Sequence, residues 1–257
     1  GHAGRNLLIG DMLPITAFTS DQIKALAPEQ VPSFSHEWEI AVMYGPHGAP
    51  DFFTKNDIDT FFANTFEIHF NSSRTGIRLI GPKPEWARED GGEAGLHPSN
   101  IHDNAYAIGA IDFTGDMPII LGPDGPSLGG FVCPAVVINS ELWKLGQLKA
   151  GDKVKFVPVS YHQAKILNEK YHAMLEATDT AQVAFDESFY PELSTLKNAV
   201  LDTLKGQDGA PDVVYRPAGN NYMLVEYGDL VLDLNLRFRI HALMQWVKEQ
   251  NSSGIID

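Results

Sequence analysis

The order of apolar and polar residues divides the chain into a β-rich first part and a mixed second part. Up to residue 160, short runs rich in Val, Ile, Phe and Tyr alternate with Gly, Pro, Asp and Asn, which is typical of strands separated by turns. We expect strands at residues 7–15, 38–44, 66–70, 77–80, 106–113, 118–121, 130–138 and 153–159. Many short strands favour a barrel or a sandwich over a parallel sheet with crossover helices.

Two short helices and two connections interrupt these strands. Thr54 is placed to cap a helix over residues 55–63, and Ser140 to cap another near residues 141–145. Residues 71–76 predict a hairpin connection. Residues 82–100 contain three prolines and three glycines and predict a long loop. A loop of that length inside a compact domain is usually either functional or disordered.

A helical period appears after residue 160. It predicts a helix over residues 161–176 and a second over residues 192–205, which Gly206 closes. A polar linker at 206–212 leads to strands at 213–216 and 222–227 and an amphipathic helix at 235–249. A strand pair and one helix cannot close a core alone, so we expect this last segment to be the start of a second module. The chain then has three regions. They are a β-barrel domain at 1–160, a helical linker at 161–211 and the incomplete start of an α+β module at 212–257.

Composition removes several classes of function. The 257 residues include 19 Lys and Arg against 33 Asp and Glu, a net charge of −14, which argues against nucleic acid or an anionic membrane as a partner. No apolar stretch approaches the roughly 20 residues of a membrane span, and no signal peptide is visible. The single cysteine, Cys133, excludes a disulfide scaffold and a multi-cysteine zinc site. Both ends of the sequence resemble cuts within a longer chain.

The negative charge is concentrated in one stretch. Residues 89–143 contain no Lys or Arg. The carboxylates in this stretch are Glu89, Asp90, Glu93, Asp103, Asp112, Asp116, Asp124 and Glu141. Asp112 is unusual because it lies between Ile111 and Phe113 at the end of an apolar run, and an unpaired buried carboxylate is costly. Its partner is then a distant cation or the ligand itself; alternatively, Asp112 ends a strand and faces solvent.

Other polar residues in this stretch give weaker signals. Residues 122–130 contain four glycines, which allow a backbone to approach a ligand closely, although a pair of tight turns explains them as well. Asp116 and Asp124 are typical turn formers. Ser127 lacks the Gly-x-Ser-x-Gly context of a nucleophile. His97, His102 and Asp103 match no strong metal pattern, and His102 with Asp103 stays open as a base and its orienter.

These residues carry a family resemblance. Residues 99–131, which read Ser-Asn-Ile-His-Asp at the start and Asp-Gly-Pro-Ser-Leu-Gly-Gly-Phe at the end, resemble the second half of an allophanate-hydrolase-subunit-2-type module. Residues 1–14 and 148–158 are similar to other parts of that module, and residues 216–228 and 233–246 to the opening of a subunit-1-type module. This order is that of the carboxyltransferase domain of urea carboxylase. The resemblance implies a cyclophilin-like β-barrel.

The resemblance also implies an activity: a biotin-dependent carboxylase, a ligase that transfers CO2 from carboxybiotin to a nitrogen of urea or guanidine. Biotin would be carried by a separate carrier domain, and ATP and bicarbonate would be used by a biotin carboxylase domain of the same cytoplasmic polypeptide. The other implied partners are the rest of the subunit-1-type module and a downstream allophanate hydrolase. No ATP-grasp region and no Met-Lys-Met biotinyl motif occur here, so we expect no turnover by this chain alone.

Site residues follow from the same resemblance. Matched by motif, the catalytic residues would be Asp103, Tyr106 and Asp112, and the substrate would contact Asn100, Asp112, Ser127, Gly129 and Gly130, without a metal. The resemblance implies Asn at the position of Asp112 in urea-using members and Asp in guanidine-using members. A guanidinium ion matches a carboxylate in a bidentate way, whereas urea needs both donors and acceptors. Two alternatives remain: a non-catalytic regulatory binding module, as in kinase-inhibitor complexes, and a 5-oxoprolinase component.

Overall fold

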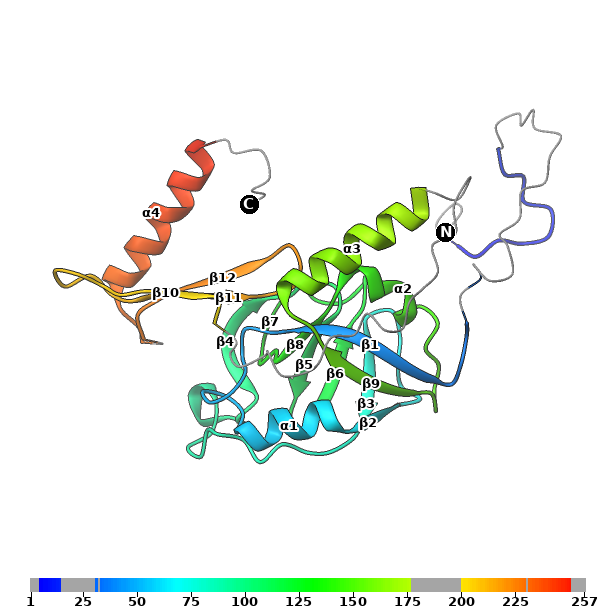
Figure 1. Cartoon of the computed structure of the whole chain (residues 1–257), viewed down its shortest axis with the longest axis horizontal. Helices are drawn as coiled ribbons and strands as arrows, with labels where there is room; N and C mark the ends of the chain where they lie inside the picture. Colours follow the sequence, from blue (N-terminus) through cyan, green and yellow to red (C-terminus); the bar gives the residue numbers. More distant parts are fainter. Residues whose placement is uncertain (1–4, 15–30, 32, 177–199, 230, 251–257) are drawn as a thin grey trace.

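Seven strands close into a barrel in the computed structural model, which describes residues 5–14, 31, 33–176, 200–229 and 231–250 (Figure 1). Around the barrel, the order is β1 (Glu37–Tyr44), β8 (Ala135–Val137), β5 (Ala110–Thr114), β6 (Met117–Leu121), β3 (Gly76–Ile80), β2 (Thr65–Ile68) and β9 (Lys153–Pro158). β1 and β9 pair in parallel, and the other neighbours pair antiparallel. The predicted mainly β chain with a barrel is confirmed.

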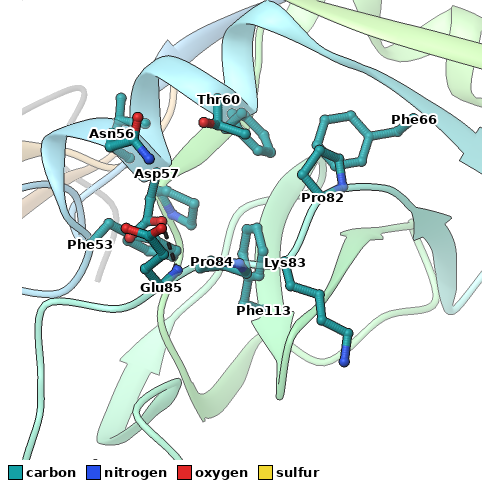
Figure 2. A pocket seen from close by; sticks show the side chains of 13 residues that line it. Phe53, Asn56, Asp57, Thr60, Phe66, Pro82, Lys83, Pro84, Glu85 and Phe113 are labelled. Carbon is teal, nitrogen blue, oxygen red and sulfur yellow. Dashed lines mark hydrogen bonds between the residues drawn. The ribbon is translucent and has the colours of Figure 1, made fainter.

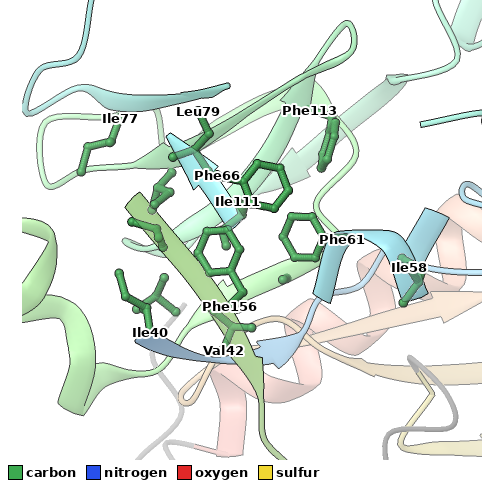
Figure 3. Packing of buried hydrophobic residues seen from close by; sticks show 14 of the residues in the cluster. Ile40, Val42, Ile58, Phe61, Phe66, Ile77, Leu79, Ile111, Phe113 and Phe156 are labelled. Atoms are coloured by element: carbon green, nitrogen blue, oxygen red, sulfur yellow. The ribbon is translucent and has the colours of Figure 1, made fainter. Parts of the chain in front are cut away.

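Alternation along the strands fills the barrel with apolar side chains (Figure 3). Phe61 and Phe156 stack at its centre with ring centroids 5.1 Å apart and planes at 9°. Phe61 comes from α1 (Lys55–Ala63), whose first turn has the capping box predicted by Thr54: the Asp57 N–H donates to Thr54 Oγ1 and the Thr54 N–H to the Asp57 carboxylate. The apolar face of α1 is thereby held against the barrel core.

A two-stranded ribbon lies outside the barrel and corrects two predicted strands. It pairs β4 (Asn100–Ala105) with β7 (Leu128–Phe131) in antiparallel fashion, with a bulge in β4. The single strand predicted at 106–113 is wrong, because Gly109 adopts a φ of +86° and separates the ribbon from β5. The single strand predicted at 130–138 is also wrong. Between β7 and β8, the backbone of residues 132–134 bonds to Ser99 and to the loop at residues 45–47.

Three further predictions differ from the structure. Residues 7–14 form no strand, since the Asp11 carboxylate binds Arg5 and the Leu8 N–H in a local turn, and residue 15 lies outside the described residues. The helix predicted at 192–205 falls on undescribed residues up to 199, and its end is instead the strand β10 (Asp202–Leu204). Ser140 caps no helix: a 3-10 turn at Asn139–Glu141 leads into α2 (Leu142–Leu145).

The remaining elements follow the barrel in sequence. α3 (Tyr161–Glu176) has the predicted bounds. β10 pairs with β11 (Val213–Pro217), β11 pairs with β12 (Met223–Tyr227), and α4 (Leu234–Gln250) comes last. This sheet contacts the barrel through an ion pair of Arg216 with Asp51 at 3.2 Å. The boundaries of the three predicted regions stay a prediction. Within the described ranges, no helix has the length and apolarity needed to cross a membrane.

Candidate functional site

Asp112 lies on the outer face of the barrel, in the strand β5. Its neighbours Ile111 and Phe113 point into the barrel core, so the alternation of the strand turns Asp112 the other way. An apolar cluster covers that outer face. Its buried members are Tyr106, Ala110, Ile119, Leu121, Cys133 and Val136. With 3% of its surface exposed, Asp112 is buried in this cluster and does not face solvent at a strand end. The two donors of the cluster bond elsewhere: the Tyr106 hydroxyl donates to the Phe131 carbonyl oxygen and the Cys133 thiol to the Ala135 carbonyl oxygen.

One oxygen of the Asp112 carboxylate has no partner in the part of the chain that the structure describes. Its Oδ1 atom is fully buried and makes no hydrogen bond. Burial raises the pKa of this carboxyl to about 7, because the surrounding apolar groups cannot stabilise its charge. A cationic ligand at Asp112 would restore the missing interaction and favour the ionised form. This combination of burial, a missing partner and a raised pKa marks Asp112 as a candidate functional residue.

Tyr106 ties the ribbon together at the edge of the same cluster. Its hydroxyl accepts the Phe131 N–H and donates to the Phe131 carbonyl oxygen, both at 2.7 Å. Burial raises the Tyr106 pKa, and the Asp112 carboxylate adds to the effect, which indicates that the two side chains are close. A phenol engaged in this way holds β7 in place. Its predicted catalytic role stays a prediction.

Gly129 and Gly130 have a structural reason to be glycines. A Cβ atom on Gly129 would lie 2.9 Å from the Tyr106 ring, and one on Gly130 would lie 2.8 Å from the His102 carbonyl oxygen. The close approach of β7 to β4 and Tyr106 therefore requires residues without side chains. Their predicted contacts with the substrate are not tested by this packing.

The other predicted site residues lie on or next to the ribbon. Asn100 opens β4 and pairs with Phe131 of β7. Asp103 lies within the bulge of β4 and is exposed, and Ser127 directly precedes β7 with its carbonyl oxygen bonded to the Tyr106 N–H at 2.9 Å. The structure thus gathers the predicted site residues around one ribbon above Asp112. Their roles in binding or catalysis stay predictions.

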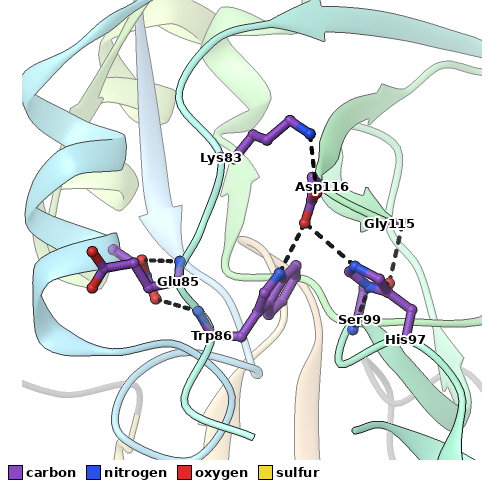
Figure 4. Close-up of polar contacts among 8 residues, drawn as sticks. Lys83, Glu85, Trp86, His97, Ser99, Gly115 and Asp116 are labelled. Carbon is purple, nitrogen blue, oxygen red and sulfur yellow. Dashed lines mark hydrogen bonds and ion pairs between the residues drawn. The ribbon is translucent and has the colours of Figure 1, made fainter. Parts of the chain in front are cut away.

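Two carboxylates that the sequence analysis gave no functional role anchor the long loop at residues 82–100. Asp57 accepts the backbone N–H groups of Glu85 at 2.7 Å and Trp86 at 3.1 Å. Asp116 accepts the Trp86 indole N–H at 3.0 Å and lies 3.3 Å from His97 Nε2 (Figure 4). The indole hydrogen bond is the main reason that the Asp116 pKa is lowered. Asp116 does occupy the predicted turn, but it also fixes the loop.

His47 and Arg88 are further residues that the sequence analysis missed. His47 Nδ1 accepts the Cys133 N–H at 3.1 Å. Burial lowers the His47 pKa to about 3, with the guanidinium groups of Arg216 and Arg88 adding to the shift, so the ring is neutral. Arg88 Nη1 donates to the Asn100 carbonyl oxygen at 2.8 Å. The one sequence signal for Arg88 is its place as the last cation before the cation-free stretch.

The acid-rich stretch is partly neutralised by cations from outside it. Three of its carboxylates form ion pairs: Asp116 with Lys83 at 3.4 Å, Asp124 with Arg74 at 2.6 Å and Glu141 with Lys144 at 2.6 Å. Asp124 also lies in a turn, as predicted. A single acidic cleft does not explain the composition of this stretch. Asp112 differs from the paired carboxylates in having no such cation.

The hypothesis of a metal at His97, His102 and Asp103 finds no matching geometry. His97 bonds to Ser99 through Nδ1 and approaches Asp116 through Nε2. Across the residues that the structure describes, no three His, Cys, Asp or Glu side chains gather as ligands for an ion. His102 and Asp103 are both exposed on β4.

Two pockets of the described structure are lined by residues other than Asp112. One of about 180 Å³ opens beside α1, with Phe66 and Phe113 as apolar walls and Lys83 at the rim (Figure 2). The other, of about 500 Å³, lies between β2 and α2 and is lined by Ile77, Trp143 and other apolar residues. Neither lining includes Asp112 or the ribbon. Among the described residues, the feature that marks the candidate site is therefore the unpartnered Oδ1 atom of Asp112.

Comparison with known families gives one match that covers most of the chain. The family model described as "Carboxyltransferase domain, subdomain A and B" matches residues 1–158. That range contains the whole barrel and the ribbon, including every predicted site residue.

Known proteins are similar over a longer range. The urea amidolyase of Lachancea kluyveri is 46% identical over 269 residues, which cover 100% of this chain and 15% of that protein. The crystal structure of the K. lactis urea amidolyase matches with a TM-score of 0.77 and 48% identity, covering 91% of this chain and 14% of that one. The Kluyveromyces lactis urea carboxylase structure gives the same TM-score and identity over 90% and 21%. The chain therefore spans about a seventh of the length of the curated relatives it matches.

Proposed function

Because this chain belongs to the family described as "Carboxyltransferase domain, subdomain A and B", we propose that it is part of a larger biotin-dependent enzyme. In this part, a carboxyl group would be transferred to a nitrogen of urea or guanidine. The similarity of the chain to urea amidolyases and to a urea carboxylase supports this proposal. Carboxybiotin, borne by a carrier domain elsewhere in the polypeptide, would supply the carboxyl group when bound and would be left as biotin. ATP and bicarbonate would be used by the biotin carboxylase domain. The remaining partners are the rest of the second module and allophanate hydrolase.

The acceptor in this proposal is guanidine, and the observation that carries it is the buried Asp112 carboxylate with its unpartnered Oδ1 atom. A guanidinium ion presents parallel N–H donors that match the two oxygens of a carboxylate. Binding it would replace a costly unpaired charge with a charge-assisted pair. Asp112 would then hold the acceptor and orient one nitrogen toward the incoming carboxyl group, and its burial would exclude water from that contact.

Urea fits the same site less well. It is neutral and presents a carbonyl oxygen as well as N–H groups, so an ionised carboxylate satisfies its donors and repels its acceptor. A protonated Asp112 could serve both, and the raised pKa of about 7 makes that form available below neutral pH. The two acceptors therefore have opposite pH preferences at this residue. We assign guanidine because the ionised form prevails above pH 7.

The ribbon has the chemistry that a bound biotin needs. The ring system of biotin is uncharged and largely apolar, with one ureido group that requires hydrogen-bond partners. Leu128 of β7 is 60% exposed and gives an apolar surface, and the neighbouring Ser127 side chain is exposed for hydrogen bonding. Gly129 adds backbone groups at the same strand. These residues would hold the ring next to Asp112. Tyr106 would keep β7 in position through Phe131.

Two other functions have less support. A non-catalytic regulator or a 5-oxoprolinase component would be expected to resemble this chain mainly in its barrel. The similarity to the urea amidolyase of Lachancea kluyveri instead covers all of the chain, including the residues after the barrel. A cytoplasmic location, and the absence of turnover by this chain alone, stay predictions.

The test is a comparison of acceptors in the intact enzyme. With ATP and bicarbonate present, kcat/KM is measured for guanidine and for urea between pH 6 and pH 9. We expect guanidine to be the better substrate, with a kcat/KM that rises through a pH of about 7 as Asp112 ionises. A kcat/KM that favours urea across this range would contradict the proposed acceptor. An intact enzyme that uses neither compound would contradict the proposed function as a whole.

A further inference from the structure

His97 is the centre of a hydrogen-bonded chain that the proposed function does not use. Its Nδ1 accepts the Ser99 backbone N–H at 3.2 Å and lies 3.0 Å from Ser99 Oγ. Its Nε2 lies 3.3 Å from Asp116 Oδ1 (Figure 4). Because Nδ1 accepts a hydrogen bond, the proton of the neutral ring is on Nε2, where it faces Asp116. The order is therefore carboxylate, imidazole and hydroxyl.

These three residue types also form nucleophilic triads, but Ser99 is not available as a nucleophile. Its exposed fraction is 0%, and its Oγ already accepts the Gly115 N–H at 3.1 Å. A triad serine must instead reach the substrate with a free oxygen. The chain of hydrogen bonds fixes a backbone segment and does not activate a hydroxyl.

The backbone segment fixed in this way, at Ser99, leads into the candidate site at Asn100. The Ser99 carbonyl oxygen accepts the Val132 N–H at 2.9 Å, so Ser99 connects the β5–β6 turn, the end of β7 and His97. The next residue, Asn100, opens β4, and its carbonyl oxygen accepts from Arg88. A shift of Ser99 would thus move Asn100 directly.

The charged group recorded in contact with His97 is Asp116, which in turn pairs with Lys83. Asp116 belongs to the β5–β6 turn, and Lys83 of the long loop lies 3.4 Å from the other oxygen of Asp116. The Trp86 ring packs edge-on against the His97 ring at 5.4 Å and donates its indole N–H to Asp116. Asp116 and Trp86 hold the plane of the imidazole, while 38% of the His97 side chain remains exposed.

From this geometry we propose that His97 is a positioning residue for the acceptor site, which it serves by fixing Ser99 and thereby Asn100. The inference rests on the proposed function, because Asn100 matters only if the acceptor binds beside it. The atom responsible is Nδ1, which accepts from Ser99. The contact of Nε2 with Asp116 orients the ring.

Two isosteric variants of the intact enzyme separate the two nitrogens. His97→Asn places an amide oxygen near the position of Nδ1, and His97→Gln places an amide near the position of Nε2. We expect His97→Gln to raise KM for the acceptor about tenfold with a smaller change in kcat, and His97→Asn to remain within about threefold of wild type. His162→Gln, at an exposed histidine of α3, is the matched control and should change nothing.

Hydrogen exchange gives a readout that does not depend on turnover. Faster exchange of the Ser99 and Asn100 amides in His97→Gln than in His97→Asn is the expected result, whatever the acceptor. Equal KM values in both variants, a change confined to Tm, or equal exchange would overturn the inference. If the exchange differs as expected while the wild-type enzyme uses neither urea nor guanidine, the proposed function fails and the fixing of Ser99 stands.

Discussion

Asp57 and Asp112 are both buried carboxylates, but their surroundings differ. Asp57 accepts backbone N–H groups from Thr54, Glu85 and Trp86, at 2.7–3.1 Å. Asp112 lies in an apolar cluster with an unpartnered Oδ1. A satisfied carboxylate stabilises the segments that donate to it, whereas an unsatisfied one lowers stability and is available to a ligand. The comparison separates a structural carboxylate from a functional candidate by their hydrogen bonds.

The largest change in the free energy of unfolding is expected on substitution of Asp57. Asp57→Ala removes the acceptor for three backbone N–H groups and should lower the free energy of unfolding by about 3 kcal/mol. Chemical denaturation of the chain measures this loss. Asp59→Ala, two residues further along α1 at an exposed carboxylate, is the control and should change stability by less than about 0.5 kcal/mol. Equal losses in both variants would show that the buried hydrogen bonds are not the cause.

A substitution at Asp112 is expected to raise the free energy of unfolding, where the substitution at Asp57 lowers it. Burial raises its folded pKa to about 7, above the value near 3.9 of an unfolded chain, so the folded protein binds the extra proton between these values. Stability attributable to this group therefore falls as pH rises from about 4 to 7. Asp112→Asn should raise the free energy of unfolding on the order of 2 kcal/mol at pH 8, with little gain at pH 4. A loss of stability at pH 8 would contradict the account of Asp112 as an unpaired charge.

A smaller effect tests how the ribbon is held above Asp112. Tyr106→Phe removes the hydroxyl that both accepts from and donates to Phe131, at the cost of about 1–2 kcal/mol in the free energy of unfolding. Tyr222→Phe, at an exposed tyrosine, is the control and should be neutral. No difference between the two variants in chemical denaturation would mean that the Tyr106 hydroxyl does not hold β7.

The sequence predicted elements whose signals are local. The capping box at Thr54 and the helical period at residues 161–176 depend on neighbouring residues, and both are confirmed. The ribbon was missed because a single run of apolar residues does not reveal where a strand leaves the barrel; Gly109 makes that break. The local pattern at residues 202–204 predicts helix, but these residues form β10 because pairing with β11 is a tertiary contact that outweighs local propensity.

Motif matching named the residues of the candidate site but not what supports them. Asn100, Asp103 and Gly129 lie on the ribbon strands β4 and β7, and their roles stay predictions. Asp116 was read only as a turn former, since its bonds to Trp86 and His97 join residues that are far apart in sequence. The acid-rich stretch also looked uncompensated because its cations, such as Arg74, come from other parts of the chain.

The most direct test of the central claim, that Asp112 selects the acceptor, is the ratio of kcat/KM for guanidine to that for urea in the intact enzyme. Asp112→Asn should lower this ratio by about 10- to 150-fold, or ~1.5–3 kcal/mol, the range for a hydrogen bond to a charged group. Asp124→Asn, at an exposed turn carboxylate paired with Arg74, is the control. An unchanged ratio in Asp112→Asn would show that this carboxylate does not recognise the acceptor.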